Sequence, residues 1–286
     1  MRNLPMRIVD RVRAATTLAA RRATAGMRGG PDYILLGTQR AGTTSLFRDL
    51  RLHPQVAPPL VKEIHFFDFN HAKGTSWYHA HFPTQRQLDE RTAREGMAIT
   101  GEATPNYLRH PHAARWAAAE LPESTKFIVT LRNPVDRAFS HWKLMSLLGH
   151  ETLDFADAIA REEERIGADW EKMQRDPHHE ARTYFQFSYV ARGRYAEQLE
   201  EWMKRIDPSR ILVVRTEDHY ARPAEIYAEV TDFLGLRPWQ PDHFSEMHAT
   251  ATSAPPREVA AQLQSSFAPE NARLAELVGR DFGWEA

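Results

Sequence analysis

The 286-residue sequence contains no cysteine. This absence excludes disulfide bonds, zinc sites with thiolate ligands and cysteine nucleophiles, and it fits a reducing compartment. The chain also lacks an uninterrupted apolar run of the about 20 residues that a transmembrane helix needs, and its N-terminal segment lacks the apolar core of a signal peptide. We therefore expect a cytoplasmic protein.

The sequence has almost no net charge, because 37 Lys and Arg residues nearly balance 38 Asp and Glu residues. No global field would attract nucleic acid or an anionic membrane, so any anion site must be local. The aromatic residues are scattered without a basic stripe, which argues against a nucleic-acid partner. The histidines show no H-E-x-x-H spacing, so no metal site is predicted, and the absence of G-x-S-x-G leaves a serine hydrolase unsupported.

Two regions are expected along the chain. Residues 1–30 carry seven arginines and one acid. They form either a basic amphipathic helix that makes peripheral membrane or partner contact, or a frayed, solvated arm, which we favour. Residues 31–286 are expected to form a single domain, because an apolar content of 42% is ordinary for a chain with one large core.

Short apolar runs alternate with helical patterns in this domain. Runs bounded by turn signals predict strands covered on both faces, at 33–36, 64–67, 98–103, 126–131 and 210–215. The intervening periodicity predicts helices at 43–52, 112–121, 134–148, 189–206 and 223–234. Alternation of this kind indicates an α/β fold with a central, mostly parallel sheet flanked by helices.

Two helical segments have further features. In the fourth predicted helix Tyr195, Leu199, Trp202 and Ile206 recur at spacings of three or four, which marks one buried stripe. Residues 149–182 are strongly charged and keep helical periodicity, so we expect a helical insertion at the surface. This insertion is either a lid over a site or a solvated helix without a role in binding.

The stretch "YILLGTQRAGTTSL" joins a predicted strand to a predicted helix through Gly37 and Gly42. Such a turn directs backbone N–H groups and the positive end of the helix dipole at one point, which favours an anion. A nucleotide-triphosphate loop would carry lysine where Thr43 stands. Without that lysine the loop suits a smaller 5′-phosphate group, with one added charge from Arg40.

A second candidate anion site follows the strand at 126–131. "LRNPVDRAFSHW" places Arg132 at the strand end and Ser140 on the next helix, where both can face a phosphate. Two anion sites at the carboxyl ends of parallel strands indicate one ligand with two separated phosphates.

Together these motifs resemble the sulfotransferase family that uses 3′-phosphoadenosine 5′-phosphosulfate (PAPS), in the branch of the heparan sulfate sulfotransferases and many bacterial relatives. The resemblance covers about residues 31–283 and includes "KEIHFFD", "GEATPNYL" and "RGRYAEQLEEW". It implies a P-loop-like three-layer fold and an enzyme that transfers a sulfuryl group from PAPS without a required metal.

The resemblance also implies which residues bind the donor. Arg132 and Ser140 would bind its 3′-phosphate, and Arg40 stands where the family more often has the lysine that assists the leaving group. The 5′-phosphosulfate would be held by the loop residues Ala41, Gly42, Thr43, Thr44 and Ser45. Secondary candidates near the nucleotide are Arg192 and Tyr195, although the apolar stripe marks Tyr195 as a core residue first.

In "KEIHFFD" the resemblance assigns Glu63 as the general base and His65 with Asp68 as supporting residues that also contact the acceptor. Two residues apart on a strand, Glu63 and His65 would share one face. Trp77, with Tyr78 and Phe82, is a candidate for lining the acceptor cleft.

The acceptor is expected to be a hydroxyl, and less readily an amine, of a carbohydrate, glycolipid or small natural product. Ala103 stands where glycan-modifying relatives often have lysine, and together with the near-neutral charge this favours an uncharged acceptor. Two alternatives remain open: a degenerate P-loop kinase that uses ATP and magnesium, and a nucleotide-binding module without catalysis.

Overall fold

The computed structural model describes residues 16–245 and 254–284, and its centre is a five-stranded sheet in which all pairings are parallel. The strands are β1 (Tyr33–Gly37), β2 (Val56–Ala57), β3 (Ile99–Ala103), β4 (Lys126–Leu131) and β5 (Ile211–Arg215), in the order β2-β3-β1-β4-β5. Strand β1 lies between β3 and β4, so the strand order reverses at its carboxyl end. Parallel sheets bind their ligands at such a reversal.

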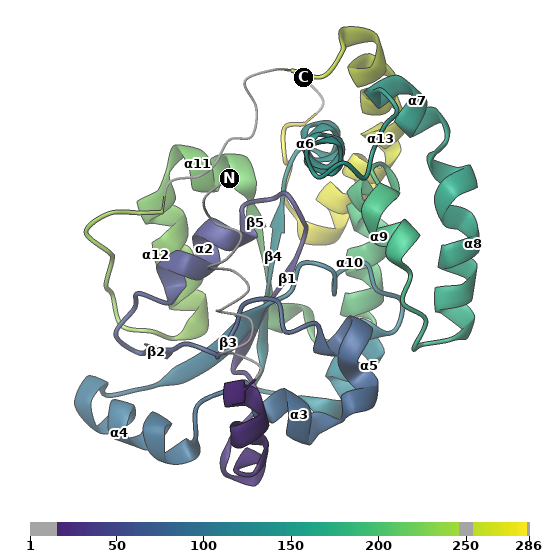
Figure 1. Ribbon diagram of the computed structural model, residues 1–286. Helices are drawn as coiled ribbons and strands as arrows, with labels where there is room; N and C mark the ends of the chain where they lie inside the picture. The colour runs from purple at the N-terminus through teal and green to yellow at the C-terminus, as the bar shows by residue number, and fades with distance from the viewer. Residues whose placement is uncertain (1–15, 246–253, 285–286) are drawn as a thin grey trace.

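Helices cover both faces of the sheet (Figure 1). One face packs against α2 (Thr43–Leu50) and α12 (Pro223–Leu234), and the other against α5 (Ala113–Glu120), α10 (Tyr195–Met203) and α13 (Arg257–Val278). Alternate residues of β1 enter the two cores, because Tyr33 and Leu35 face α2 while Ile34 and Leu36 face α5 and α10. The fold is the predicted three-layer α/β fold.

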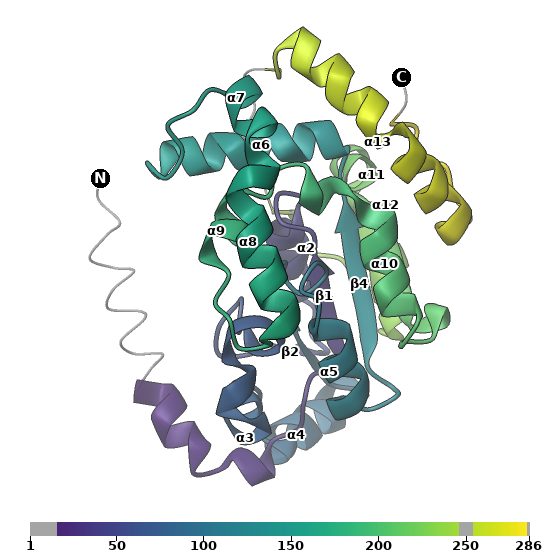
Figure 2. The same ribbon diagram turned by 90° about the vertical axis from the view of Figure 1, so that its right-hand side faces the viewer.

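A further helical layer lies beyond the end of β4 (Figure 2). It consists of α6 (Pro134–Leu147), α7 (Phe155–Ala160), α8 (Glu162–Arg175) and α9 (Arg182–Phe187). Three shorter or peripheral helices complete the fold: α3 (Thr75–His79), α4 (Gln85–Glu95) and α11 (Thr216–Ala221). Asn133 begins α6 by accepting hydrogen bonds from the N–H groups of Val135 and Asp136, which places Ser140 two turns further along.

Most of the predicted elements are confirmed. The strands at 33–36, 98–103, 126–131 and 210–215 form, and the helix at 223–234 has the expected bounds. The helix predicted at 189–206 begins only at Tyr195, after a 3₁₀ turn at Ala191–Gly193, and its apolar stripe is buried as expected. Helices α3, α4, α11 and α13 were not predicted; α4 buries only Leu88, and α13 carries Pro269 in its interior, which argues against a helix.

The strand predicted at 64–67 is wrong. Residues Phe66–Asn70 form a π-helical turn instead, and Glu63 and His65 before it have positive φ values of 62° and 57°. The apolar pair at 66 and 67 is buried as a strand would be, but it packs against Tyr78 of α3 with ring centroids 4.3 and 5.3 Å apart. Periodicity alone cannot separate a buried turn from a short buried strand.

The N-terminal segment is docked on the domain from residue 16 onward. Residues 16–22 are helical, and Leu18 packs against the core under α3. Arg28 donates through Nη1 to the carbonyl of Phe82 at 2.6 Å. The expected frayed arm is therefore wrong for residues 16–30, and residues 1–15 lie outside the described residues. Over the described residues, no helix combines the length and the apolar character that crossing a membrane requires.

Candidate active site

The glycine loop connects β1 to α2 at the centre of the sheet edge. Gly37 has φ 136°, and a Cβ there would lie 2.5 Å from the carbonyl oxygen of Pro105, so only glycine allows this approach. Gly42 is the N-cap of α2 with φ 76°, and no side chain caps the helix. Thr43 and Ser45 are buried in the first turn, whereas Thr44 is exposed. The first turn contains no acid, so its N–H groups and dipole favour an anion.

Two arginines and a serine from neighbouring strand ends converge beside this loop. Arg40 donates through Nε to Ser140 Oγ at 3.0 Å, which joins the glycine loop to α6. Burial and the charge of Arg132 lower the pKa of Arg40. Tyr195 is buried and donates through its hydroxyl to the Arg132 carbonyl at 2.9 Å, so it supports the β4 end from the core. The structure therefore brings together the predicted cations of both anion sites.

Further positive groups are buried close to these cations. Arg137 is 0% exposed, and its Nε and Nη1 have no hydrogen-bond partner among the described residues. Burial and the charges of Arg132 and Arg40 lower its pKa, although nearby Tyr195 and Glu162 oppose this effect. Orphaned guanidinium donors of this kind are costly in a folded protein unless an anion lies near. Arg137 therefore adds positive potential behind Arg40 and Arg132, which favours an anion at this end of the sheet.

Tyr220 is a residue of this site that sequence reasoning missed. Tyr220 of α11 lies beside Gly42, with its Cε1 3.4 Å from where a Cβ would be. Arg132 and Arg40 both influence the pKa of Tyr220, which burial raises. Nothing in its local sequence, "EDHYARP", distinguishes it from an ordinary helical tyrosine.

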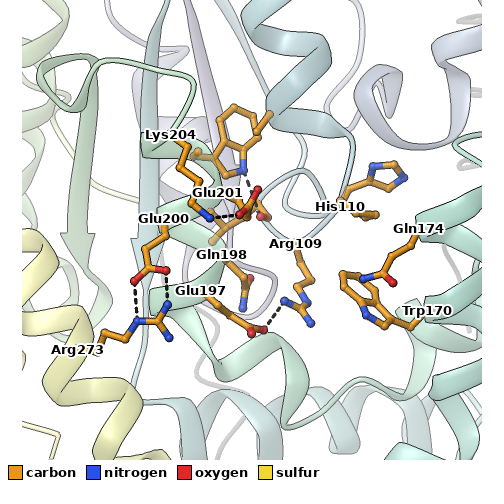
Figure 3. Close-up of a pocket in the computed structure, with 14 residues that line it drawn as sticks. Arg109, His110, Trp170, Gln174, Glu197, Gln198, Glu200, Glu201, Lys204 and Arg273 are labelled. Atoms are coloured by element: carbon orange, nitrogen blue, oxygen red, sulfur yellow. Dashed lines mark hydrogen bonds and ion pairs between the residues drawn. The ribbon is translucent and has the colours of Figure 1, made fainter.

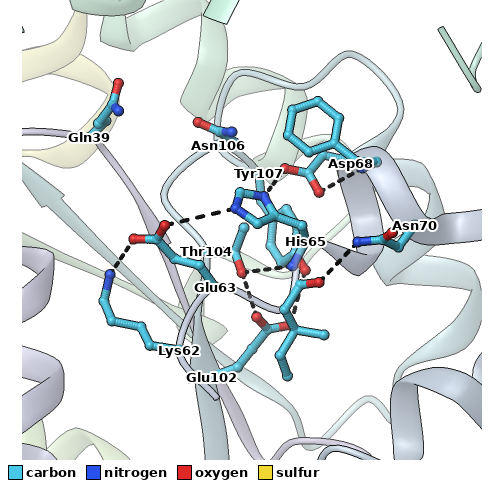
Figure 4. A network of polar contacts seen from close by, with 12 residues as sticks. Gln39, Lys62, Glu63, His65, Asp68, Asn70, Glu102, Thr104, Asn106 and Tyr107 are labelled. Atoms are coloured by element: carbon cyan, nitrogen blue, oxygen red, sulfur yellow. Dashed lines mark hydrogen bonds and ion pairs between the residues drawn. The ribbon is translucent and has the colours of Figure 1, made fainter. Parts of the chain in front are cut away.

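The second half of the site is a short loop after β2 (Figure 4). His65 Nδ1 lies 2.7 Å from Asp68 Oδ2, and His65 Nε2 lies 3.8 Å from Glu63 Oε2. The second Glu63 oxygen lies 2.5 Å from Lys62 Nζ. Glu63 and His65 thus lie side by side as predicted. The cause is the positive φ angle of each residue, and not a shared face of a strand.

These contacts set the protonation of the pair. Burial acts to raise the pKa of Glu63, but the neighbouring imidazole of His65 and the charge of Lys62 outweigh it and lower that pKa to about 2. Burial acts to lower the pKa of His65, but Asp68 and Glu63 raise it to about 10. At neutral pH the loop therefore holds a carboxylate beside an imidazolium.

A cleft of about 290 Å³ opens above this pair. It is lined by Gln39, Glu63, His65, Phe69, Pro105, Asn106, Arg182, Phe185 and Gln186. The last three belong to α9, which begins at the final residue of the predicted insertion, so the segment directly after the insertion forms one wall of the cleft. Trp77, Tyr78 and Phe82 do not line it; they are buried in the core behind the loop. The expected acceptor contact of Trp77 is therefore not supported by its position.

Comparison with known proteins identifies the family. The family model described as "Sulfotransferase domain" matches residues 30–270. The chain belongs to the sulfotransferase family. A crystal structure of a sulfotransferase from Alicyclobacillus acidocaldarius superposes with a TM-score of 0.68 and 30% identity, covering 90% of this chain and all of that one.

Curated relatives show the same relationship. Heparan sulfate glucosamine 3-O-sulfotransferase 6 of Homo sapiens is 30% identical over 91% of this chain and 75% of its own length. Membrane-associated sulfotransferase kil1 of Dictyostelium discoideum is 26% identical over 89% of this chain and 66% of its own length. This sulfotransferase thus spans about two thirds to three quarters of these relatives.

A buried glutamate supports the loop that holds Glu63 and His65 in this sulfotransferase. Glu102 is 0% exposed and accepts hydrogen bonds from the hydroxyls of Thr104 and Tyr78, both at 2.6 Å. Tyr107 donates to the same carboxyl at 3.1 Å and accepts from the Phe66 N–H at 2.6 Å, which ties the π-turn to β3. Burial raises the pKa of Glu102 to about 7. Sequence reasoning placed this glutamate in a family motif but gave it no role.

A second cavity, of about 390 Å³, lies between α10, α5 and α8 (Figure 3). Its charged side chains are paired with one another, as Glu200 with Arg273 and Glu201 with Lys204. Arg109 reaches across it and lies 4.2 Å from the ring centroid of Trp170, which holds α8 against the core. None of the predicted site residues lines this cavity.

Proposed function

We propose that this sulfotransferase transfers a sulfuryl group from PAPS to an acceptor hydroxyl in the cleft above Glu63. One observation carries the proposal: a glycine loop and two arginines at the ends of β1 and β4 converge on the strand edge that also holds the Glu63–His65 pair. Anion binding and a proton acceptor are the two requirements of sulfuryl transfer to an alcohol.

Donor binding is assigned to two units, the first turn of α2 and the end of β4 with α6. The N–H groups of the first turn of α2, with the Thr43 and Thr44 hydroxyls, would hold the 5′-phosphosulfate. Arg132 and Ser140 would bind the 3′-phosphate, which other adenine nucleotides lack. PAPS supplies a sulfuryl group on a good leaving group, so the protein's task is positioning and charge neutralisation.

The chemical step assigns one role to each catalytic side chain. Glu63 accepts the proton of the acceptor hydroxyl while the acceptor oxygen bonds to sulfur. The bond from sulfur to the bridging oxygen breaks, and its electron pair leaves with 3′-phosphoadenosine 5′-phosphate (PAP). Arg40 neutralises the charge that develops on that oxygen, and Glu63 then passes its proton to water. His65, positively charged and held by Asp68, keeps Glu63 ionised before the step.

The acceptor is proposed to be an uncharged carbohydrate, glycolipid or small natural product. The curated relative named above acts, by its name, on heparan sulfate glucosamine. In this chain, however, the cleft wall offers two phenylalanine rings, and its one arginine, Arg182, is paired with Glu180 at 2.7 Å. Such a wall suits a flat, neutral molecule better than a polyanion.

The direct test is transfer of label from ³⁵S-PAPS to a panel of neutral glycosides, glycolipids, phenols and desulfated heparan sulfate. We expect a labelled sulfate ester on a neutral acceptor, formed in the presence of a metal chelator and lost in Glu63→Gln. If no acceptor is labelled although the protein binds PAP tightly, the non-catalytic nucleotide-binding alternative holds. Phosphate transfer from ATP with magnesium would establish the kinase alternative.

A further inference from the structure

Arg192 is a buried cation between the two halves of the site. Its side chain is 1% exposed, and it lies just before α10, at a position that faces the ends of β1 and β3. Nη1 donates to Oε1 of Gln39 in the glycine loop, and Nη2 donates to Oδ1 of Asn106 in the loop after β3. Its guanidinium carbon also lies 5.0 Å from the ring centroid of Phe185 on α9. One side chain thus contacts the glycine loop, the loop after β3 and helix α9.

The hydrogen-bond partners of Arg192 are neutral amides, and its Nε has no partner among the described residues. A buried charge without a carboxylate partner is expensive, because two amide oxygens replace only part of its hydration. Burial, followed by the charge of Arg137, lowers the pKa of Arg192 to about 9. A hydrophobic residue or an ion pair at this position would give a more stable fold than an arginine bound only to amides.

The contacts of Arg192 determine how both amides are oriented. A guanidinium group only donates, so the atoms that face it must be the amide oxygens. A partner without acceptor atoms leaves one orientation for each amide. The NH₂ groups of Gln39 and Asn106 therefore point away from Arg192. Both residues line the cleft that also contains Glu63 and His65 (Figure 4).

We propose that Arg192 is a positioning residue that presents the NH₂ groups of Gln39 and Asn106 as hydrogen-bond donors to the sulfuryl oxygens during transfer. This inference rests on the proposed function. The transferring group has three oxygens that carry negative charge, and donors fixed in advance stabilise such a group more than donors that must reorient. Gln39 precedes the donor cation Arg40 and Asn106 lies in the loop after β3, so the two donors come from different loops that one guanidinium joins.

Two isosteric variants distinguish a purely structural role of Arg192 from the proposed positioning role. Asn106→Asp and Gln39→Glu give Arg192 the carboxylate partner that it lacks, but each replaces a cleft donor by an acceptor. If Arg192 only joins the loops, both variants should melt at the wild-type temperature or above and retain kcat. If Arg192 orients the two donors, both variants should melt at the wild-type temperature or above but have a much lower kcat.

The experiment measures melting temperature, the Kd for PAP, kcat and KM for wild type, Asn106→Asp, Arg192→Gln and Arg192→Lys. For Asn106→Asp we expect an undiminished melting temperature and a loss in kcat of about 100-fold, the scale for one fixed donor at a developing charge. For Arg192→Gln, whose side chain tolerates either amide orientation, we expect kcat to fall about 10-fold with KM and the PAP Kd nearly unchanged. Arg192→Lys should recover part of that loss.

Arg210→Gln is the matched control, because Arg210 also donates to protein oxygens, the carbonyls of Thr125 and Pro122, far from the cleft. It should change stability without changing kcat. Wild-type kcat in folded Arg192→Gln and Asn106→Asp would overturn the role given to Arg192 while leaving sulfuryl transfer intact. No transfer by the wild-type enzyme itself would instead overturn the proposed function.

Discussion

The donor side and the acceptor side of this site are built in different ways. The donor side uses two contiguous units, β1 with α2 and β4 with α6, and each carries its binding groups within about ten residues. The acceptor side combines the loop at 62–65, the loop after β3 and helix α9, whose lining residues Glu63 and Gln186 are 123 positions apart. Backbone anion sites are local and can be recognised in a sequence, whereas a cleft wall depends on tertiary packing.

One backbone feature is common to both sides. Arg40, Glu63 and His65 are the non-glycine residues with positive φ in the part of the chain that the structure describes, at 73°, 62° and 57°. A non-glycine residue in this region costs free energy and persists where the surrounding structure enforces it, often at functional sites. The strain therefore marks the same three side chains that the mechanism uses.

The largest expected effect comes from removing the proton acceptor on the acceptor side. Glu63→Gln keeps the size of the side chain but cannot take a proton, so kcat should fall about 1,000-fold, within the usual range for a general base. Calorimetry should show the same Kd for PAP as in wild type. Glu90→Gln, which removes an exposed ion pair with Arg86, is the matched control and should be fully active. Retained activity in Glu63→Gln would show that another group is the base.

On the donor side, Arg132→Ala should weaken PAP binding by about 10- to 100-fold, because a charge-assisted hydrogen bond contributes about 1.5–3 kcal/mol. AMP, which lacks the 3′-phosphate, should bind the variant and the wild type equally. Titration of both nucleotides checks this difference, with Arg222→Ala on the protein surface as the control. Equal weakening of AMP and PAP would place Arg132 at the 5′ end of the nucleotide.

A smaller effect is expected from the carboxylate behind His65. Asp68→Asn should lower kcat about 10-fold and should lower the pKa of His65, because Asp68 is the strongest contributor that raises it. The raised pKa of about 10 means that protonated His65 stabilises the fold below pH 6.5, and that this stabilisation is lost as the pH rises through 10. The melting-temperature difference between wild type and Asp68→Asn should therefore shrink over that interval. A constant difference would contradict the assigned protonation.

The smallest effect should come from weakening the contacts that hold α9 in place, without changing a residue that lines the cleft. Arg109 donates through Nε to the Tyr184 hydroxyl at 2.6 Å and lies over Trp170, so Arg109→Gln should make α9 less well placed. We expect KM for the acceptor to rise about 3-fold, in line with the loss of one cation–π contact, while PAP binding stays unchanged. A change in PAP binding instead would show that the two sides are not separable.

The same contrast explains what the sequence could predict. Strand β4 was predicted with its bounds, and Arg40 and the pair Arg132 and Ser140 were predicted at two neighbouring anion sites, because glycine, proline and strand-end arginine leave local signals. Gln39 and Asn106 were missed, because an amide in a loop has no distinctive pattern and their common partner Arg192 is 153 positions from Gln39.

Trp77 and the strand at 64–67 were misplaced for a related reason. Their apolar character correctly indicated burial, but the choice between cleft wall, strand and core turn depends on contacts with distant elements. The positive φ angles at Glu63 and His65, which bring the catalytic pair together, have no signature in non-glycine residues.

The central claim, a donor site built for PAPS, is tested most directly by calorimetric titration with PAP, run beside AMP and beside ATP with and without magnesium. The account predicts tight binding of PAP that does not depend on magnesium and that weakens strongly when the 3′-phosphate is absent. Preferential binding of ATP with magnesium would contradict it.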